Sequence, residues 1–209
     1  MNDGIPVSVP ARGSIVLGAD DALVVVDVQR DFLPGGALAV PEGDRVVPAI
    51  NRYLARFERD GRLVVLTRDW HPADHVSFRA QGGPWPPHCV AGTPGAGFAD
   101  GLALPATAIF ISKATRPEVD AYSDFEGTPL ADWLHKLGIR RLLVGGIATD
   151  YCVQATVLDA LREGFEVLLL VDAIRPVDVQ PGDGARAEQA MVQAGARPIR
   201  FGDLAGAGA

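Results

Sequence analysis

Residues 22–28 read ALVVVDV, a run of apolar and mostly β-branched residues that is closed by an aspartate and a valine. The run does not alternate between apolar and polar residues, which indicates a strand buried on both faces, as in a parallel sheet. Comparable runs recur along the chain at 62–67, 107–112, 140–146 and 165–172, with a weaker one at 197–201. We therefore expect six strands.

Helical patterns separate several of these runs. In 44–59 the apolar residues recur on one helical face, with Asp44 as the expected N-cap and Gly61 as the stop. Further helices are expected over 128–137, about 150–163 and about 183–194. Because strands and helices alternate, the sequence predicts an α/β fold with a doubly wound, mostly parallel six-stranded sheet and helices on both faces, a Rossmann-like three-layer arrangement. The 209 residues fit a single domain, 1–209.

Composition excludes several classes of function. The net charge is −7, whereas a nucleic-acid-binding protein needs clustered Lys and Arg. No apolar stretch approaches the roughly 18 residues of a membrane-spanning helix. The N-terminal residues MNDGIPVSVPARGS lack the pattern of a signal peptide, and two cysteines are poor evidence for a disulfide. We therefore expect a cytoplasmic protein without a nucleic-acid or membrane partner.

Polar residues follow the expected strands at the edge where α/β sheets bind ligands. Asp27 follows the first strand, and Lys113 follows the third in ISKAT. Taken alone, Asp27 is equally compatible with a turn or capping role, and Lys113 with a solvated strand end. They become candidates for a site because parallel strands bring their carboxyl ends to one edge.

A loop rich in histidine follows the second strand. Asp69 and His71 are two residues apart in TRDWHPADH, so in extended chain they point to the same side, and His88 follows in WPPHCV. A carboxylate and two imidazoles suit a divalent metal such as zinc or iron. Each histidine alone would be an ordinary surface or core residue, but three of the four in the chain fall in this loop. His75 is either a fourth ligand or a residue that supports the others.

Cys152 lies just after a glycine-rich turn, in VGGIATDYCVQATV (144–157). The first turn of a helix presents free N–H groups and the positive end of the helix dipole, which favour a thiolate and can hold a developing oxyanion. The alternative is a small buried apolar residue. Cys89 has no comparable surroundings and is expected to play that structural role.

Five segments of the chain resemble the motifs of nicotinamidases, a family of isochorismatase-like cysteine hydrolases. The segments are VVVDVQRDF (24–32), TRDWHPADHVSF (67–78), WPPHCVAGTPGAGF (85–98), ISKATRPEVDAYSDFEGTPL (111–130) and GGIATDYCVQATVLDAL (145–161). The resemblance covers about 22–172 in the same order. Isochorismatases share this fold but lack the nucleophilic cysteine, so Cys152 favours amide hydrolysis over vinyl-ether cleavage.

The resemblance implies a role for each matched residue. It implies a catalytic triad of Asp27, Lys113 and Cys152 and a metal site of Asp69, His71 and His88. It implies an oxyanion hole formed by the backbone N–H groups of Ala148 and Cys152, beside a cis peptide between Ile147 and Ala148. The aromatic walls of the substrate pocket match Phe32, Trp85 and Tyr122.

The implied activity is metal-dependent hydrolysis of nicotinamide to nicotinate and ammonia through a cysteine thioester, a step of NAD salvage, with pyrazinamide as a further substrate. Zinc is the expected ion, with iron or manganese as alternatives. The rival enzyme is an amidase of the same superfamily acting on a carbamoyl or ureido substrate. A binding protein on the same scaffold and a redox-sensing thiol protein are rivals from other classes. The sequence leaves open whether the chain forms a homo-oligomer.

Overall fold

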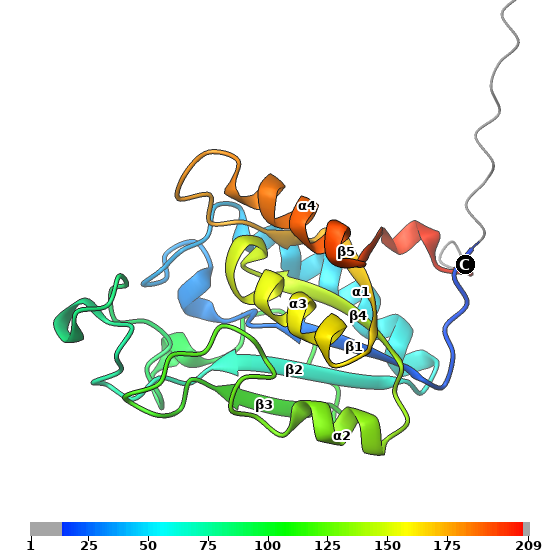
Figure 1. The fold of residues 1–209 in the computed structure, drawn as a ribbon, viewed down its shortest axis with the longest axis horizontal. Coiled ribbons are helices and arrows are strands. Elements are labelled where there is room, and N and C mark those ends of the chain that lie inside the picture. The colour runs from blue at the N-terminus through cyan, green and yellow to red at the C-terminus, as the bar shows by residue number, and fades with distance from the viewer. Residues whose placement is uncertain (1–13, 207–209) are drawn as a thin grey trace, which may run out of the picture.

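The computed structural model describes residues 14–206, and a six-stranded sheet forms their centre (Figure 1). The strands lie in the order β3-β2-β1-β4-β5-β6, and every neighbouring pair is parallel. The strands are β1 (Asp21–Val26), β2 (Leu63–Asp69), β3 (Ile109–Lys113), β4 (Arg141–Ile147), β5 (Glu166–Arg175) and β6 (Arg197–Ile199). The helices are α1 (Val46–Arg59), α2 (Leu130–Lys136), α3 (Gln154–Arg162) and α4 (Asp183–Ala194). The predicted α/β class is confirmed, and the sheet is parallel throughout.

Helices cover both faces of the sheet, which gives the three expected layers. Successive residues of β1 show the division, because Leu23 and Val25 pack in the core beneath α1, whereas Val24 and Val26 pack in the core beneath α2, α3 and α4. The side chains of β1 are almost entirely buried on both faces, since this strand is central. A continuous apolar run in the sequence is the consequence of this double burial.

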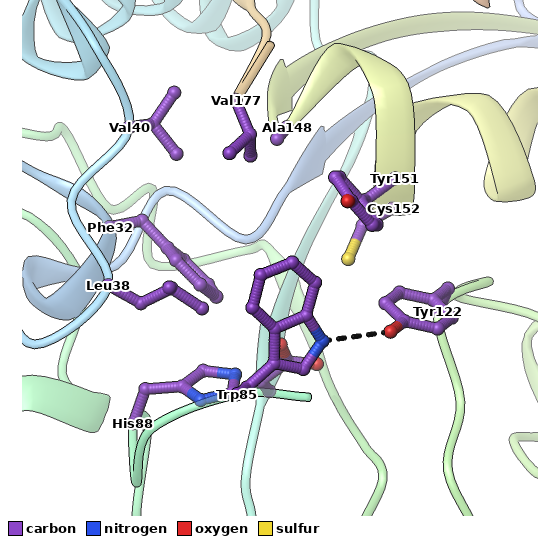
Figure 2. A pocket seen from close by; sticks show the side chains of 11 residues that line it. Phe32, Leu38, Val40, Trp85, His88, Tyr122, Ala148, Tyr151, Cys152 and Val177 are labelled. Carbon is purple, nitrogen blue, oxygen red and sulfur yellow. Dashed lines mark hydrogen bonds between the residues drawn. The ribbon is translucent and has the colours of Figure 1, made fainter. Parts of the chain in front are cut away.

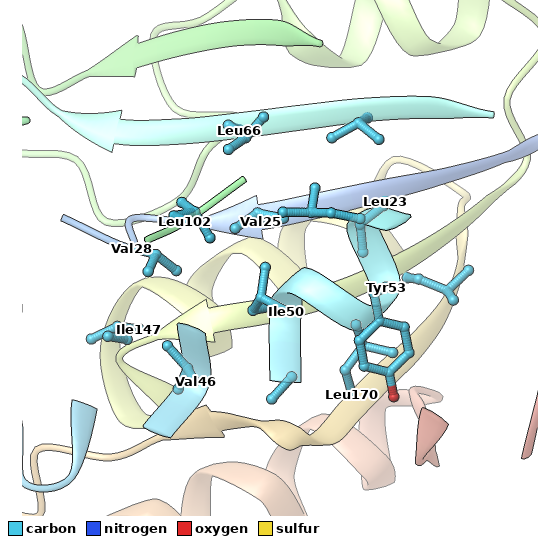
Figure 3. Packing of buried hydrophobic residues seen from close by; sticks show 14 of the residues in the cluster. Leu23, Val25, Val28, Val46, Ile50, Tyr53, Leu66, Leu102, Ile147 and Leu170 are labelled. Atoms are coloured by element: carbon cyan, nitrogen blue, oxygen red, sulfur yellow. The ribbon is translucent and has the colours of Figure 1, made fainter. Parts of the chain in front are cut away.

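The α1 helix follows its predicted face closely. Ile50, Tyr53 and Phe57 are fully buried and recur at helical spacing, and Figure 3 shows Ile50 and Tyr53 pointing from α1 toward the strands. The chain leaves the helix through Gly61, which has a φ of +62°. The predicted N-cap was wrong: Asp44 lies in a preceding 3-10 turn, and Arg45 occupies the N-cap position without a side-chain cap.

The long connections gather at the carboxyl ends of β2 and β3, where the arrowheads in Figure 1 point. The segment between these two strands contains two 3-10 turns, Arg79–Gln81 and Pro94–Ala96, and no longer helix. None of the described helices combines the length and apolar character needed to cross a membrane. The site is therefore to be sought at this edge of the sheet, where strand ends and long loops meet.

Candidate active site

Four adjacent strands deliver one polar group each to the same edge. Asp69 and Lys113 are the last residues of β2 and β3 and face each other as Cα partners in the ladder. Asp27 follows β1 directly and has a φ of +47°, so the strand turns at this residue. Cys152 lies in the turn that follows β4. The register of the parallel sheet thus brings together groups that are up to 125 residues apart (152 − 27).

Lys113 is the centre of the resulting cluster. Its Nζ lies 2.9 Å from Oδ2 of Asp27 and 2.5 Å from Oδ1 of Asp69, and it donates to Sγ of Cys152 at 3.5 Å. The carboxylate oxygens of Asp27 and Asp69 and the sulfur of Cys152 lie within 4.8 Å of one another. Lys113 is 1% exposed and Asp27 is fully buried. Lys113 is therefore buried and not solvated at the end of its strand, and two carboxylates compensate its charge.

Burial dominates the electrostatics of this cluster. It raises the pKa of Asp27 to about 6, against the lowering effect of the Lys113 ammonium. Burial alone would lower the pKa of Lys113, but the carboxylates of Asp27 and Asp69 outweigh it and raise that pKa well above its usual value. At neutral pH the cluster therefore holds an ammonium ion and an Asp27 carboxylate that is largely ionised and able to accept a proton.

The thiol of Cys152 differs from the sequence-based expectation. Its position at a helix start predicted a lowered pKa. Burial and the neighbouring carboxylates instead raise the pKa of the thiol well above its usual value, although the Lys113 ammonium lowers it. The helix start is also irregular, because Thr149–Val153 form a π-helical turn before α3 begins. The resting residue is therefore a thiol beside a carboxylate, an arrangement that suits proton abstraction by Asp27.

The turn that carries Cys152 begins with a cis peptide between Ile147 and Ala148, as the resemblance implied. Gly146, just before it, has a φ of +134°, and a Cβ there would lie 2.0 Å from the carbonyl oxygen of Val26. Only glycine lets β4 approach β1 this closely. The carbonyl of Ala148 accepts hydrogen bonds from later residues of the turn. The assignment of the N–H groups of Ala148 and Cys152 to an oxyanion hole remains a prediction.

Asp150 ties this turn to the segment after β5. Its carboxylate accepts hydrogen bonds from the backbone N–H groups of Val177 at 2.8 Å and of Asp178 at 2.9 Å. Val177 lines the pocket beside Cys152. The nucleophile candidate and this part of the pocket wall are therefore joined by two hydrogen bonds to one charged group.

A pocket opens in front of Cys152, and Figure 2 shows the sulfur pointing toward Trp85 and Tyr122. Nε1 of Trp85 donates to the hydroxyl of Tyr122 at 2.9 Å, which joins two of the expected aromatic walls. The walls are mostly apolar, which suits a flat aromatic ring. The lining residues are Phe32, Leu38, Val40, Asp69, Trp85, His88, Tyr122, Ala148, Tyr151, Cys152 and Val177.

Asp69, His71 and His88 form a compact group whose candidate ligand atoms all lie within 4.8 Å of one another. Within residues 14–206, neither ring nitrogen of the buried His71 has a hydrogen-bond partner. Nδ1 of His88 donates to the carbonyl of Pro86 at 2.8 Å, which leaves Nε2 free to bind a metal. Burial lowers the pKa of His88 and favours its neutral, ligating form. The donor set fits a zinc ion.

His75 is not part of this group. Its Nδ1 lies 2.8 Å from the hydroxyl of Ser77, and its Nε2 donates to the carbonyl of Val119 at 3.1 Å. Its ring packs against that of His71, with the centroids 4.2 Å apart and the ring planes tilted by 39°. Of the two roles considered for His75, the geometry therefore supports a residue that packs against a ligand.

The structure brings together all the residues that the sequence suggested for the site, and it adds others. Leu38, Val40 and Val177 line the pocket, although no motif or spacing distinguished them, and so does Tyr151, which lies within the motif around Cys152. Gln29, which is fully buried, also went unnoticed. Its position in VVVDVQRDF was the available signal, because an amide directly after a buried strand needs hydrogen-bond partners.

We expect iodoacetamide to alkylate Cys152 ahead of Cys89. Cys152 faces the pocket, whereas Cys89 is fully buried and its pKa is also raised by burial. Lys113→Met should slow the reaction at Cys152 by about tenfold, because it removes the cation that favours the thiolate. Mass spectrometry after brief treatment at neutral pH measures both rates.

The matched control is Lys136→Met, which replaces the only other lysine of the chain, an exposed residue of α2. Circular dichroism checks that the Lys113→Met protein is folded, since it leaves two buried carboxylates without their cation. Faster reaction of Cys89, or an unchanged rate in folded Lys113→Met protein, would contradict the role given to Lys113.

Known proteins resemble this chain over most of its length. The isochorismatase domain family matches residues 21–201. The nicotinamidase of Escherichia coli (strain K12) is 43% identical over 203 residues, which are 87% of this chain and 95% of that protein. A pyrazinamidase of Pyrococcus horikoshii, solved in complex with zinc, is 53% identical with a TM-score of 0.84, over 87% of this chain and 99% of that chain.

A further solved structure, PnC1 from L. infantum in complex with nicotinate, is 36% identical with a TM-score of 0.84 and covers 91% of this chain and 98% of that chain. The segment matched by the family includes every residue of the Lys113 cluster, the metal group and the pocket. The fold is therefore shared across nearly the whole length of the two solved structures.

Proposed function

The chain belongs to the isochorismatase family, and from that membership we propose that it hydrolyses the carboxamide of nicotinamide to nicotinate and ammonia. It is a hydrolase of the nicotinamidase and pyrazinamidase kind. The observation that carries the proposal is the contact of Lys113 with Asp27 and Cys152 directly behind an apolar pocket that also adjoins Asp69 and His88. The pocket thus combines a nucleophile, a base and candidate metal ligands within reach of one small ring.

The first half of the reaction uses Asp27 and Cys152. Asp27 takes the thiol proton as general base, and the sulfur forms a bond to the carboxamide carbon while the carbonyl π electrons move to oxygen. The backbone N–H groups of Ala148 and Cys152 donate to that oxyanion. When the C–N bond breaks, Asp27 returns its proton to the leaving nitrogen, and ammonia departs from a thioester.

The second half regenerates the thiol. Asp27 takes one proton from water, whose oxygen attacks the thioester carbon, and the C–S bond breaks to release nicotinic acid, which loses its remaining proton to solvent and becomes nicotinate. The sulfur recovers the proton from Asp27. Lys113 stays protonated throughout and keeps Asp27 ionised between steps, since its pKa lies well above neutral pH.

Asp69, His71 and His88 would hold a divalent ion at the pocket wall, and zinc is the ion found in the P. horikoshii relative. A bound ion supplies a Lewis-acidic partner for the ring nitrogen of the substrate. Phe32 and Trp85 flank the ring, and their apolar faces exclude water from the reacting carbon. We also propose pyrazinamide as a substrate, because it keeps both the carboxamide and the ring nitrogen meta to it. We further propose that the protein is cytoplasmic.

The direct test is release of ammonia from nicotinamide by the purified protein, before and after chelator treatment and after zinc is added back. We expect turnover that chelator removes and zinc restores. Benzamide is the matched substrate, since it has the same carboxamide but no ring nitrogen, and should react on the order of 10²-fold more slowly. Ammonia released only from an N-carbamoyl or ureido substrate would refute the proposal in favour of the rival amidase.

A further inference from the structure

Two structural requirements conflict at the carboxyl end of β1. It must turn at Asp27, so that the carboxylate reaches Lys113. It would also have to pair with β2 as far as Asp69 for the sheet to bind the backbone N–H and C=O groups of that residue. The ladder between β1 and β2 ends at the pair Val25 and Leu66. Three residues of β2 therefore extend beyond the last β1 partner.

The side chain of Gln29 fills the place of the missing strand. Its Oε1 accepts the backbone N–H of Asp69 at 2.8 Å, and its Nε2 donates to the backbone carbonyl of the same residue at 2.8 Å. In a parallel ladder, one residue exchanges its N–H and its C=O with the same neighbouring strand. The Gln29 amide thus supplies Asp69 with one acceptor and one donor, as a continuing β1 would.

Gln29 makes two further hydrogen bonds, one through its side-chain amide and one through its backbone. Nε2 donates its second hydrogen to the carbonyl of Ala96 at 2.9 Å, in the loop between β2 and β3. The backbone N–H of Gln29 donates to the carbonyl of Asp27 at 2.8 Å. Gln29 is fully buried and therefore connects the backbones of Asp27 and Asp69 rigidly.

The position of Asp69 matters because its two oxygens serve two different sites. Oδ1 contacts Nζ of Lys113, while Oδ2 faces Nε2 of His71 at 3.6 Å in the candidate metal group. If the backbone of Asp69 were displaced, at least one of its two carboxylate oxygens would move away from its partner. We propose that Gln29 is the positioning residue that holds Asp69 in register for both Lys113 and the divalent ion. The inference rests on the proposed metal site and does not depend on the identity of the substrate.

Zinc affinity of the metal-free protein, measured by competition with a chelating dye, tests this role. We expect Gln29→Ala to raise the zinc dissociation constant by about 10–100-fold, the usual effect of losing a residue that orients a ligand. The isosteric Gln29→Glu should also weaken zinc binding, because a carboxylate can accept from Asp69 but cannot donate to the two carbonyl oxygens. Circular dichroism and the thermal midpoint report folding in parallel.

The chain offers a matched control in Asn51. Its side-chain amide also holds a loop backbone by two hydrogen bonds, donating to Gly101 at 2.7 Å and accepting from Ala103 at 2.8 Å. Asn51→Ala should leave the zinc dissociation constant within about twofold of the parent value, since Gly101 and Ala103 are not candidate ligands and follow His88 by 13 and 15 residues (101 − 88 and 103 − 88). A comparable loss of zinc affinity in Asn51→Ala would overturn the inference, because it would show a general loosening of the fold.

Unchanged zinc affinity in folded Gln29→Ala and Gln29→Glu proteins would also overturn the inference. A failure of both variants to fold would overturn it too, because the proposed role is to position Asp69 and not to stabilise the whole fold. Should Gln29→Ala alone fail to fold, Gln29→Glu decides. Zinc loss in the Gln29 variants of a parent that releases no ammonia from nicotinamide would support this inference and contradict only the proposed function.

Discussion

Replacing Cys152 by alanine is expected to lower the rate of ammonia release from nicotinamide by about 10⁴-fold or more, the range seen when a catalytic nucleophile is removed. Asp27 and the pocket remain in place, but no atom can form the bond to the carboxamide carbon. The fold should persist, since Cys152 faces the pocket and loses only its sulfur. The measurements are ammonia release, circular dichroism and zinc content of the same preparation.

Cys89→Ala is the matched control for this variant. Cys89 is the only other cysteine, is fully buried and makes none of the direct contacts that form the Lys113 cluster. It should retain most of the parental rate, with a loss of stability of about 1 kcal/mol from the small cavity. A folded, zinc-loaded Cys152→Ala protein that still turns over nicotinamide at a near-parental rate would remove Cys152 from the mechanism.

Replacing His71 by alanine is expected to abolish zinc binding at micromolar metal and to reduce ammonia release to the level of the chelator-treated parent. His71 is the cleanest ligand to remove, because both of its ring nitrogens lack other partners among the described residues, whereas Asp69 also contacts Lys113. Loss of one of three protein ligands leaves an incomplete site. Metal analysis after dialysis and activity during zinc titration measure the two effects separately.

His135→Ala serves as the control for histidine loss, because His135 lies on α2 with its side chain half exposed, far from the candidate ligands in the chain. It should keep both zinc and activity. Full activity in a metal-free His71→Ala protein would show that the Asp69, His71 and His88 group has no part in turnover.

The strands could be predicted from the sequence because each one is buried on both faces and is therefore continuously apolar. The predicted run 140–146 and β4 (Arg141–Ile147) differ by one residue at each end. The ends of the last two strands were more difficult to predict from the sequence. β5 extends to Arg175, past a register shift between Val144 and Gly146 of its partner, and β6 ends at Ile199 before a 3-10 turn. Irregular pairing leaves no periodic signal in one sequence.

The position of Asp27, Lys113 and Cys152 at one edge followed from parallel topology, and the metal group followed from the two-residue spacing of Asp69 and His71. The effect of burial on the pKa values of these groups could not be predicted from the topology. A single sequence cannot show that Asp27, Lys113 and Cys152 share one fully buried volume, so the raised pKa of the Cys152 thiol was missed. Val177 acts through contacts with residues distant in sequence, which no local pattern encodes. For Gln29 the sequence indicated that a buried amide needs partners but not which residues they are.

The two hydrogen bonds accepted by Asp150 couple the position of Cys152 to that of Val177. Val177 and Cys152 form one wall, and moving them apart would break two hydrogen bonds to a carboxylate, a charge-assisted kind about twice as strong as a neutral one. The segment after β5 and the turn that carries the nucleophile are therefore expected to move as one unit, and a shift of either would displace Cys152 relative to the rest of the pocket.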